Sequence, residues 1–119
     1  MNTFRKGAAG ESRALSYLET RGHRLIARNY RGRHGEIDLI TREEAHLHFI
    51  EVKSWRMGSE NLEYAVGLTK RKRIIRTAEE FLSRNTRYAE DEKQFDVIYL
   101  KSDGPVVHYL PRAFEGGHS

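Results

Sequence analysis

Two stretches of the chain decide its fold: residues 35–40, with the sequence GEIDLI, and residues 49–53, with the sequence FIEVK. Each alternates polar and apolar side chains, which is the period-two pattern of a strand with two different faces. The polar connection over residues 42–46 between them is short enough for a hairpin. The two stretches therefore predict neighbouring antiparallel strands, expected over residues 36–41 and 47–53.

The register of this hairpin brings two carboxylates together. If the turn is centred between residues 44 and 45, the numbers of paired residues sum to 89, so that Asp38 faces Glu51. Directly opposed side chains have Cβ atoms about 5 Å apart, where like charges are unfavourable. The same register pairs Ile40 with Phe49, and Glu36 with Lys53. Two carboxylates so placed need a cation or must share a proton.

This arrangement of charges suits phosphoryl chemistry. Carboxylate oxygens with room for water are ligands that Mg²⁺ selects. Lys53 lies two residues beyond Glu51 on the same face, where an ammonium group can neutralise charge that develops on a phosphate. An ordinary sheet with a solvated polar face, including a Glu36–Lys53 ion pair, explains each residue taken singly. The set taken together favours a site, because a further acidic residue points to the same place.

That residue is Glu11, on a helix predicted over residues 3–21. Positions 4, 8, 11, 15 and 18 form a stripe at helical spacing that is apolar except for Glu11. Gly22 ends the helix. The stripe predicts that Glu11 points towards the sheet, where its carboxylate joins those of Asp38 and Glu51.

The other elements complete an α/β sandwich. Strands are predicted over residues 23–30, 95–100 and 106–110, a second helix over residues 69–85, and a loose tail over residues 111–119. Thr69 is placed to cap the second helix, and its inner face is expected to carry Ile74, Ala78, Phe81 and Leu82. The order gives a mixed central sheet whose third and fourth strands are parallel around the crossover helix, in one domain over residues 1–119.

Composition narrows the function classes. The chain has 119 residues, 21 basic and 17 acidic side chains, a formal charge of +4 and no cysteine, which excludes disulfides, thiol nucleophiles and cysteine-bound zinc. The absence of a long apolar run or a signal core predicts a soluble protein of the cytoplasm. The basic surplus suggests a polyanionic partner, although a solvated charged face is the commoner explanation of such clusters. The candidate cations for nucleic acid are Lys70, Arg73, Arg28, Arg31 and Arg33.

Three other polar residues are assigned structural roles. His46 and His48 alternate along a strand and could bind a metal, but without a third ligand a solvated strand end is the favoured interpretation. Asp96, at the start of the fourth strand, is interpreted as a residue that holds a loop.

The two opening stretches resemble the YraN-like family of the PD-(D/E)XK nuclease superfamily. Residues 10–11 (GE), 29–31 (NYR) and 95–97 (FDV) share this likeness, which extends to about residue 100. Ile37 stands where the superfamily's name gives proline. The resemblance implies a restriction-endonuclease-like αβββαβ sandwich, and archaeal Holliday-junction resolvases, which are dimeric, have a similar layout.

The resemblance also implies roles. Asp38, Glu51 and Glu11 would bind Mg²⁺ or Mn²⁺, and Lys53 would act on the attacking water or the transition-state charge. Lys70, early in the second helix, fits a phosphate contact. The expected activity is endonucleolytic hydrolysis of DNA, in repair or recombination, with a homodimer left open. The alternatives are a nucleic-acid-binding module of the same fold without useful turnover, or a structural role.

Overall fold

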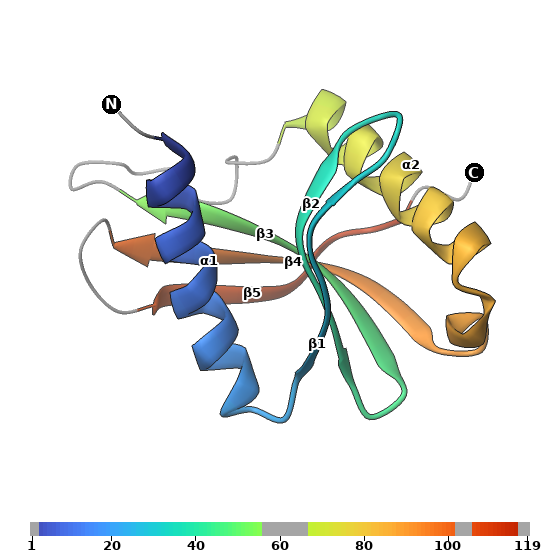
Figure 1. Ribbon diagram of the computed structural model, residues 1–119, viewed down its shortest axis with the longest axis horizontal. Coiled ribbons are helices and arrows are strands. Elements are labelled where there is room, and N and C mark those ends of the chain that lie inside the picture. Colours follow the sequence, from blue (N-terminus) through green and yellow to red (C-terminus); the bar gives the residue numbers. More distant parts are fainter. Residues whose placement is uncertain (1–2, 56–66, 102–105, 117–119) are drawn as a thin grey trace.

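The computed structural model describes residues 3–55, 67–101 and 106–116 (Figure 1). None of the helices in these ranges is long and apolar enough to cross a membrane. The elements in chain order are α1 (Thr3–Glu19), β1 (Arg24–Arg31), β2 (Glu36–Glu43), β3 (His46–Trp55), α2 (Leu68–Arg84), the 3₁₀ turn η2 (Thr86–Tyr88), β4 (Glu92–Lys101) and β5 (Val106–Phe114). Their strands form one sheet in the order β1-β2-β3-β4-β5.

The helices cover opposite faces of this sheet. Alternate residues of β3 show the division: Phe49 packs in the core under α2, with Ile74 and Phe81, whereas Ile50 packs under α1, with Leu18. β3 and β4 are parallel and the other neighbours antiparallel. The predicted α/β sandwich with a mixed sheet is therefore confirmed.

The β2–β3 hairpin has the predicted register over only part of its length. Its pairs sum to 89 from Glu43 and His46 to Leu39 and Ile50, and include Ile40 with Phe49. The predicted pairs Asp38–Glu51 and Glu36–Lys53 lie beyond the end of this ladder. There β2 continues beside β1 and β3 beside β4, so the two strands diverge (Figure 1). The expected pairing of β2 with β3 at Asp38 and Glu51 was therefore wrong. Beyond Leu39 and Ile50, β2 stays paired with β1 and β3 with β4.

Glycines let the β1–β2 turn lie against α2. A Cβ on Gly32 would come within 2.5 Å of Glu80 Oε1, and a Cβ on Gly35 would be 3.4 Å from Arg73 Cβ and from Thr77 Oγ1. Such close approach favours the residue without a side chain. Gly35, the first residue of the GEIDLI stretch, thus helps to place the start of β2 beside the first turns of α2.

Two expectations, about the start of α2 and about the C-terminal segment, were wrong. The N-cap of α2 is Gly67, with no side-chain cap, and Thr69 lies inside the helix. The segment expected to be loose from residue 111 continues β5 as far as Phe114, a buried ring that stacks on Phe95 with 5.1 Å between ring centroids. The aromatic contact holds this part of the chain, and residues 117–119 of the expected tail lie outside the described residues.

Candidate functional site

The acidic site lies where β2 and β3 diverge, between the two helices. We use this name for Glu11 of α1, Asp38 of β2, Glu51 and Lys53 of β3, and Lys70 of α2. Glu11 and Glu51 are only 7% and 5% exposed. The charges of Glu51 and Glu11 both act on Asp38 and raise its pKa, so the three predicted carboxylates are close enough to repel one another. The site draws on both helices, although α1 and α2 cover opposite faces of the sheet.

The Asp38 side chain binds the backbone of β3 beyond the point where β2 stops pairing with it. Its Oδ2 accepts a hydrogen bond from the backbone N–H of Val52 at 2.8 Å. Burial, followed by repulsion from Glu51 and Glu11, raises the pKa of Asp38 to about 7, and the Val52 N–H and Lys70 only partly oppose this. A carboxyl group that one donor supports and two like charges oppose ionises with difficulty.

Two lysines neutralise Glu51. Lys70 Nζ lies 2.5 Å from Glu51 Oε2, and Lys53 Nζ lies 3.6 Å from the same oxygen. Burial and the neighbouring Lys70 ammonium lower the pKa of Lys53. Burial also acts to lower the pKa of Lys70, but its hydrogen bond to Glu51 and the charge of Glu51 outweigh this and raise it. The carboxylate and two ammonium groups form a compact charged cluster.

Glu11 has an incomplete set of partners. Its buried Oε1 accepts no hydrogen bond, and Arg28 Nε lies 3.5 Å away as an ion pair. The Arg28 guanidinium instead donates to Ser12 Oγ through Nη2 at 2.8 Å. A buried carboxylate oxygen without a hydrogen bond is costly. It therefore offers a place for a further donor or a cation.

The three carboxylates do not close into a ready-made metal cage. Within the described ranges, one group of three or more metal-binding side chains has ligand atoms within 4.8 Å of one another, and that group is His23, Glu43 and His48. At the acidic site, Glu51 pairs with Lys70 and Glu11 with Arg28. Side-chain cations thus hold two of these carboxylates.

The predicted nucleic-acid cations divide into three groups. Arg28 and Lys70 belong to the acidic site, through Glu11 and Glu51. Arg31 is exposed and lies 3.9 Å from Glu36. Arg33 and Arg73 line a hollow of about 480 Å³ between the β1–β2 turn and α2, with four other residues: His34, Thr69, Lys72 and Arg76. This basic hollow faces solvent without an acidic lining residue.

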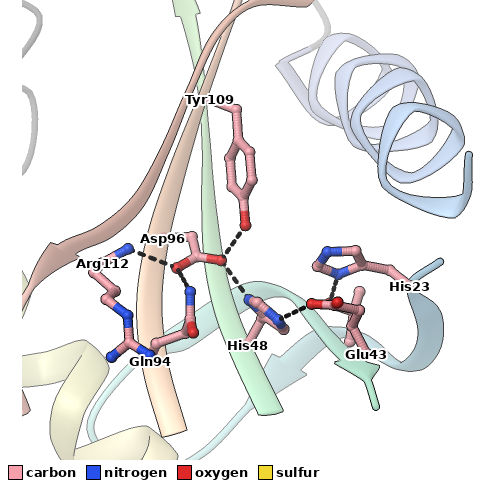
Figure 2. A network of polar contacts seen from close by, with 8 residues as sticks. His23, Glu43, His48, Gln94, Asp96, Tyr109 and Arg112 are labelled. Carbon is pink, nitrogen blue, oxygen red and sulfur yellow. Dashed lines mark hydrogen bonds and ion pairs between the residues drawn. The ribbon is translucent and has the colours of Figure 1, made fainter. Parts of the chain in front are cut away.

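A second polar centre lies at the hairpin end of the sheet, and Figure 2 shows it. We call His23, Glu43 and His48 the histidine cluster. The two imidazole rings are 4.4 Å apart, and His48 Nε2 lies 3.4 Å from Glu43 Oε1. His48 is 3% exposed, so the expectation of a solvated strand end was wrong. The fold brings two further potential ligands, His23 and Glu43, to His48, and His46 is not part of this group.

Asp96 anchors this centre from β4. Its oxygens contact His48 Nδ1 at 2.6 Å and accept hydrogen bonds from the Tyr109 hydroxyl, the Gln94 amide and the Arg112 backbone N–H, at 2.6, 3.0 and 3.0 Å (Figure 2). Burial acts to raise its pKa, but these hydrogen bonds outweigh burial and lower it. The structural interpretation of Asp96 agrees with these contacts, which tie β5 and β3 to β4.

Sequence reasoning missed His23, Glu43 and Tyr109. Part of the signal was available, since the register that sums to 89 places Glu43 directly opposite His46 at the hairpin end. His23 gives no such signal, because it lies before β1 and reaches His48 only when that strand is folded against β2. Its position in the cluster depends on tertiary structure.

The comparison with known proteins places the chain in a family. The sequence pattern of "Uncharacterised protein family UPF0102" matches residues 10–100. The chain belongs to the UPF0102 family. This membership confirms the YraN-like resemblance. The matched UPF0102 segment runs from the residue before Glu11 to the end of the β4 core and contains both polar centres apart from Tyr109 and Arg112.

UPF0102 relatives cover nearly the whole chain. A UPF0102 protein of Treponema pallidum is 43% identical over 116 residues, which cover 92% of this chain and 91% of the relative. UPF0102 proteins of Rhodopseudomonas palustris and Petrotoga mobilis are each 39% identical. They cover 94% and 93% of this chain, and 85% and 96% of the respective relative. The likeness therefore concerns the complete fold described above.

Proposed function

We propose that this chain is a divalent-metal-dependent endonuclease that hydrolyses DNA phosphodiester bonds. The observation that carries the proposal is the gathering of Glu11, Asp38 and Glu51 from three elements beside Lys53. Burying such a set costs stability, because like charges repel and the pKa of Asp38 is raised to about 7. Carboxyl groups with a pKa shifted in this way are typical of functional sites.

The donor set fits Mg²⁺ or Mn²⁺. Glu11, Asp38 and Glu51 would hold the ion, since hard cations take carboxylate oxygens. The buried Glu11 Oε1 that accepts no hydrogen bond supports this assignment. When bound, a divalent ion supplies a Lewis acid that polarises a phosphate oxygen and makes a coordinated water more acidic.

The chain's own cations would act on the substrate. The Lys53 ammonium lies on the same side as Glu51 and donates to oxygens on which charge builds during hydrolysis. Lys70 pairs with Glu51; its ammonium group would be available to contact a phosphate if Glu51 instead held a metal ion. Arg33 and Arg73 line the basic hollow. They would contact other phosphates than Lys53 and Lys70 do, and so position the DNA backbone.

Cleavage assays test the proposal. We expect the full, untagged chain to cut members of a panel of branched and linear DNAs with Mg²⁺ or Mn²⁺, and not in EDTA. Asp38→Ala and Glu51→Ala should abolish cleavage. Glu36→Gln is the matched control, because it removes a carboxylate on the same strand as Asp38 that pairs with the exposed Arg31; it should cut like the wild type.

The panel also separates the alternatives. Preferential cutting of branched DNA would assign the chain a role in repair or recombination. Binding of DNA without cleavage in any metal would make it a nucleic-acid-binding module with a nuclease fold. Cleavage that survives Asp38→Ala would remove the acidic site as its origin.

A further inference from the structure

The histidine cluster has an electrostatic problem at one atom. Asp96 accepts hydrogen bonds from Tyr109, Gln94 and the Arg112 backbone, and these bonds lower its pKa and keep it ionised. The remaining contact, at 2.6 Å, therefore has His48 Nδ1 as the donor. If the ring is neutral, the lone pair of Nε2 is then directed towards Glu43.

That nitrogen is buried beside the Glu43 carboxylate. His48 Nε2 makes no hydrogen bond, and a lone pair 3.4 Å from the Glu43 carboxylate is repelled by it. Either a proton on Nε2 or a cation between the two groups removes the repulsion. The His23 ring, whose centroid is 4.4 Å from that of His48, contributes a ligand atom to the same group and can share such a cation.

The spacing of these atoms agrees with a coordinated transition metal. Ligands about 2.0–2.2 Å from a tetrahedral Zn²⁺ lie roughly 3.3–3.6 Å from each other, and His48 Nε2 and Glu43 Oε1 are 3.4 Å apart. One ligand atom from each of His23, Glu43 and His48 lies within 4.8 Å of the others. Glu43 is only half-buried, so its flexible side chain can close the remaining distance.

We propose that His23, Glu43 and His48 form a binding site for a transition-metal ion, with Zn²⁺ as its fitting occupant. Two imidazoles and one carboxylate are ligands that suit zinc, whereas Mg²⁺ and Ca²⁺ prefer sites made of oxygen ligands alone. Asp96 is the positioning residue: it holds the His48 ring through Nδ1, as the carboxylate does in carboxylate–histidine–zinc arrangements. The site is separate from the acidic site and does not depend on the nuclease proposal.

The surroundings leave a coordination position open. His23, Glu43 and His48 line a hollow of about 340 Å³ at the surface, which gives an ion and a water access to the cluster. The bound ion would join the residue before β1 to the end of β2 and the start of β3. We therefore expect zinc to stabilise the fold by linking the hairpin to the end of α1.

Metal titration of the full, untagged, metal-free chain tests this site. We expect about one equivalent of Zn²⁺ to bind, an added excess of Mg²⁺ not to displace it, and the melting temperature to rise with zinc concentration. Co²⁺ in place of zinc should give the visible absorption of a low-coordinate site. Removing a ligand should weaken binding by on the order of 100-fold or more.

Variants separate this site from incidental binding. His48→Ala and His23→Ala should lose zinc, and Glu43→Gln, a milder change at a half-buried position, provides the test if those fail to fold. His34→Ala removes an exposed histidine of the β1–β2 turn and should keep zinc, as should Glu36→Gln on β2, outside both proposed metal sites. Failure of the wild type to bind zinc or cobalt, or equal loss in His34→Ala, would overturn the proposal.

Discussion

Asp38 and Asp96 lie in the same sheet, but their surroundings are opposite. Asp96 is fully buried and its two oxygens have four hydrogen-bonding partners, which lower its pKa. Asp38 is less buried, accepts a hydrogen bond from the Val52 N–H and faces two other carboxylates, and its pKa rises to about 7. The number of hydrogen-bond donors, and not the depth of burial alone, determines whether the pKa of a carboxyl group is raised or lowered.

The two centres differ in their expected contribution to stability. The hydrogen bonds of Asp96 tie three strands together, so its ionised form stabilises the fold. The acidic site keeps carboxylates close together at a cost, and side-chain cations only partly offset that cost. An arrangement that destabilises the resting protein is expected where a ligand is to be bound.

The largest expected effect concerns Asp96→Asn. Replacing one acceptor oxygen by an amide leaves buried donors without a partner and should lower the free energy of unfolding by about 3 kcal/mol at pH 7.5. Urea denaturation in EDTA measures it. Because the pKa of Asp96 is lowered on folding, its contribution is present above pH 4 and is lost as the pH falls through the folded pKa. A loss of stability no larger than the effect of Asp38→Asn would contradict the proposed difference between the two aspartates.

Lys53→Ala should affect turnover rather than stability. Loss of a contact made to developing charge should reduce the cleavage rate on the order of 100-fold, equivalent to about 2.7 kcal/mol. Binding of Mn²⁺, followed by calorimetry, should remain nearly intact because Lys53 is not a proposed ligand. A comparable fall in the rate of folded Asp96→Asn protein would mean that the two centres are not functionally distinct.

Asp38→Asn should stabilise the metal-free protein. The raised pKa means that the folded state binds the proton more tightly, so the cost of ionising Asp38 grows as the pH rises from about 4 to about 7. Neutralising it should add about 1 kcal/mol to the free energy of unfolding at pH 7.5, a discounted figure because solvent reaches the site. The amide oxygen can still accept from Val52 N–H.

Thermal and urea denaturation in EDTA at pH 7.5 and 4.5 check this sign. The advantage of Asp38→Asn should shrink at the lower pH, and adding Mg²⁺ or Mn²⁺ should reverse the order because the wild type gains the binding energy. A wild type that is the more stable protein in EDTA and does not respond to metal would assign these carboxylates a structural role.

The smallest expected effect concerns the surface cations. If Arg33 and Arg73 meet phosphates, the logarithm of DNA affinity should fall linearly with the logarithm of salt concentration, and each change to Ala should reduce that slope by about one unit. Arg31→Ala is the matched control, because Arg31 pairs with Glu36 outside the basic hollow. Equal slopes for all three variants would assign the arginines to a solvated face.

Local patterns explain how much of the fold was predictable. Alternation over residues 35–40 and 49–53 indicated the strands, and the short connection gave the register that Ile40 and Phe49 adopt. The same reasoning failed at Asp38 and Glu51, since it considered one pair of strands and not the competing neighbours of each. The hydrogen bond from Val52 N–H to Asp38 is a consequence of that competition.

The order of elements followed from local sequence patterns, and the quoted motifs indicated the family and the candidate residues Glu11, Asp38, Glu51 and Lys53. These predictions were possible because periodicity and hairpin register are local properties of the chain. The divergence of β2 and β3, the pairing of Lys70 with Glu51 and the contact of His23 with His48 emerged only in the folded structure. These contacts join segments far apart in sequence, and their geometry depends on how both helices pack against the sheet.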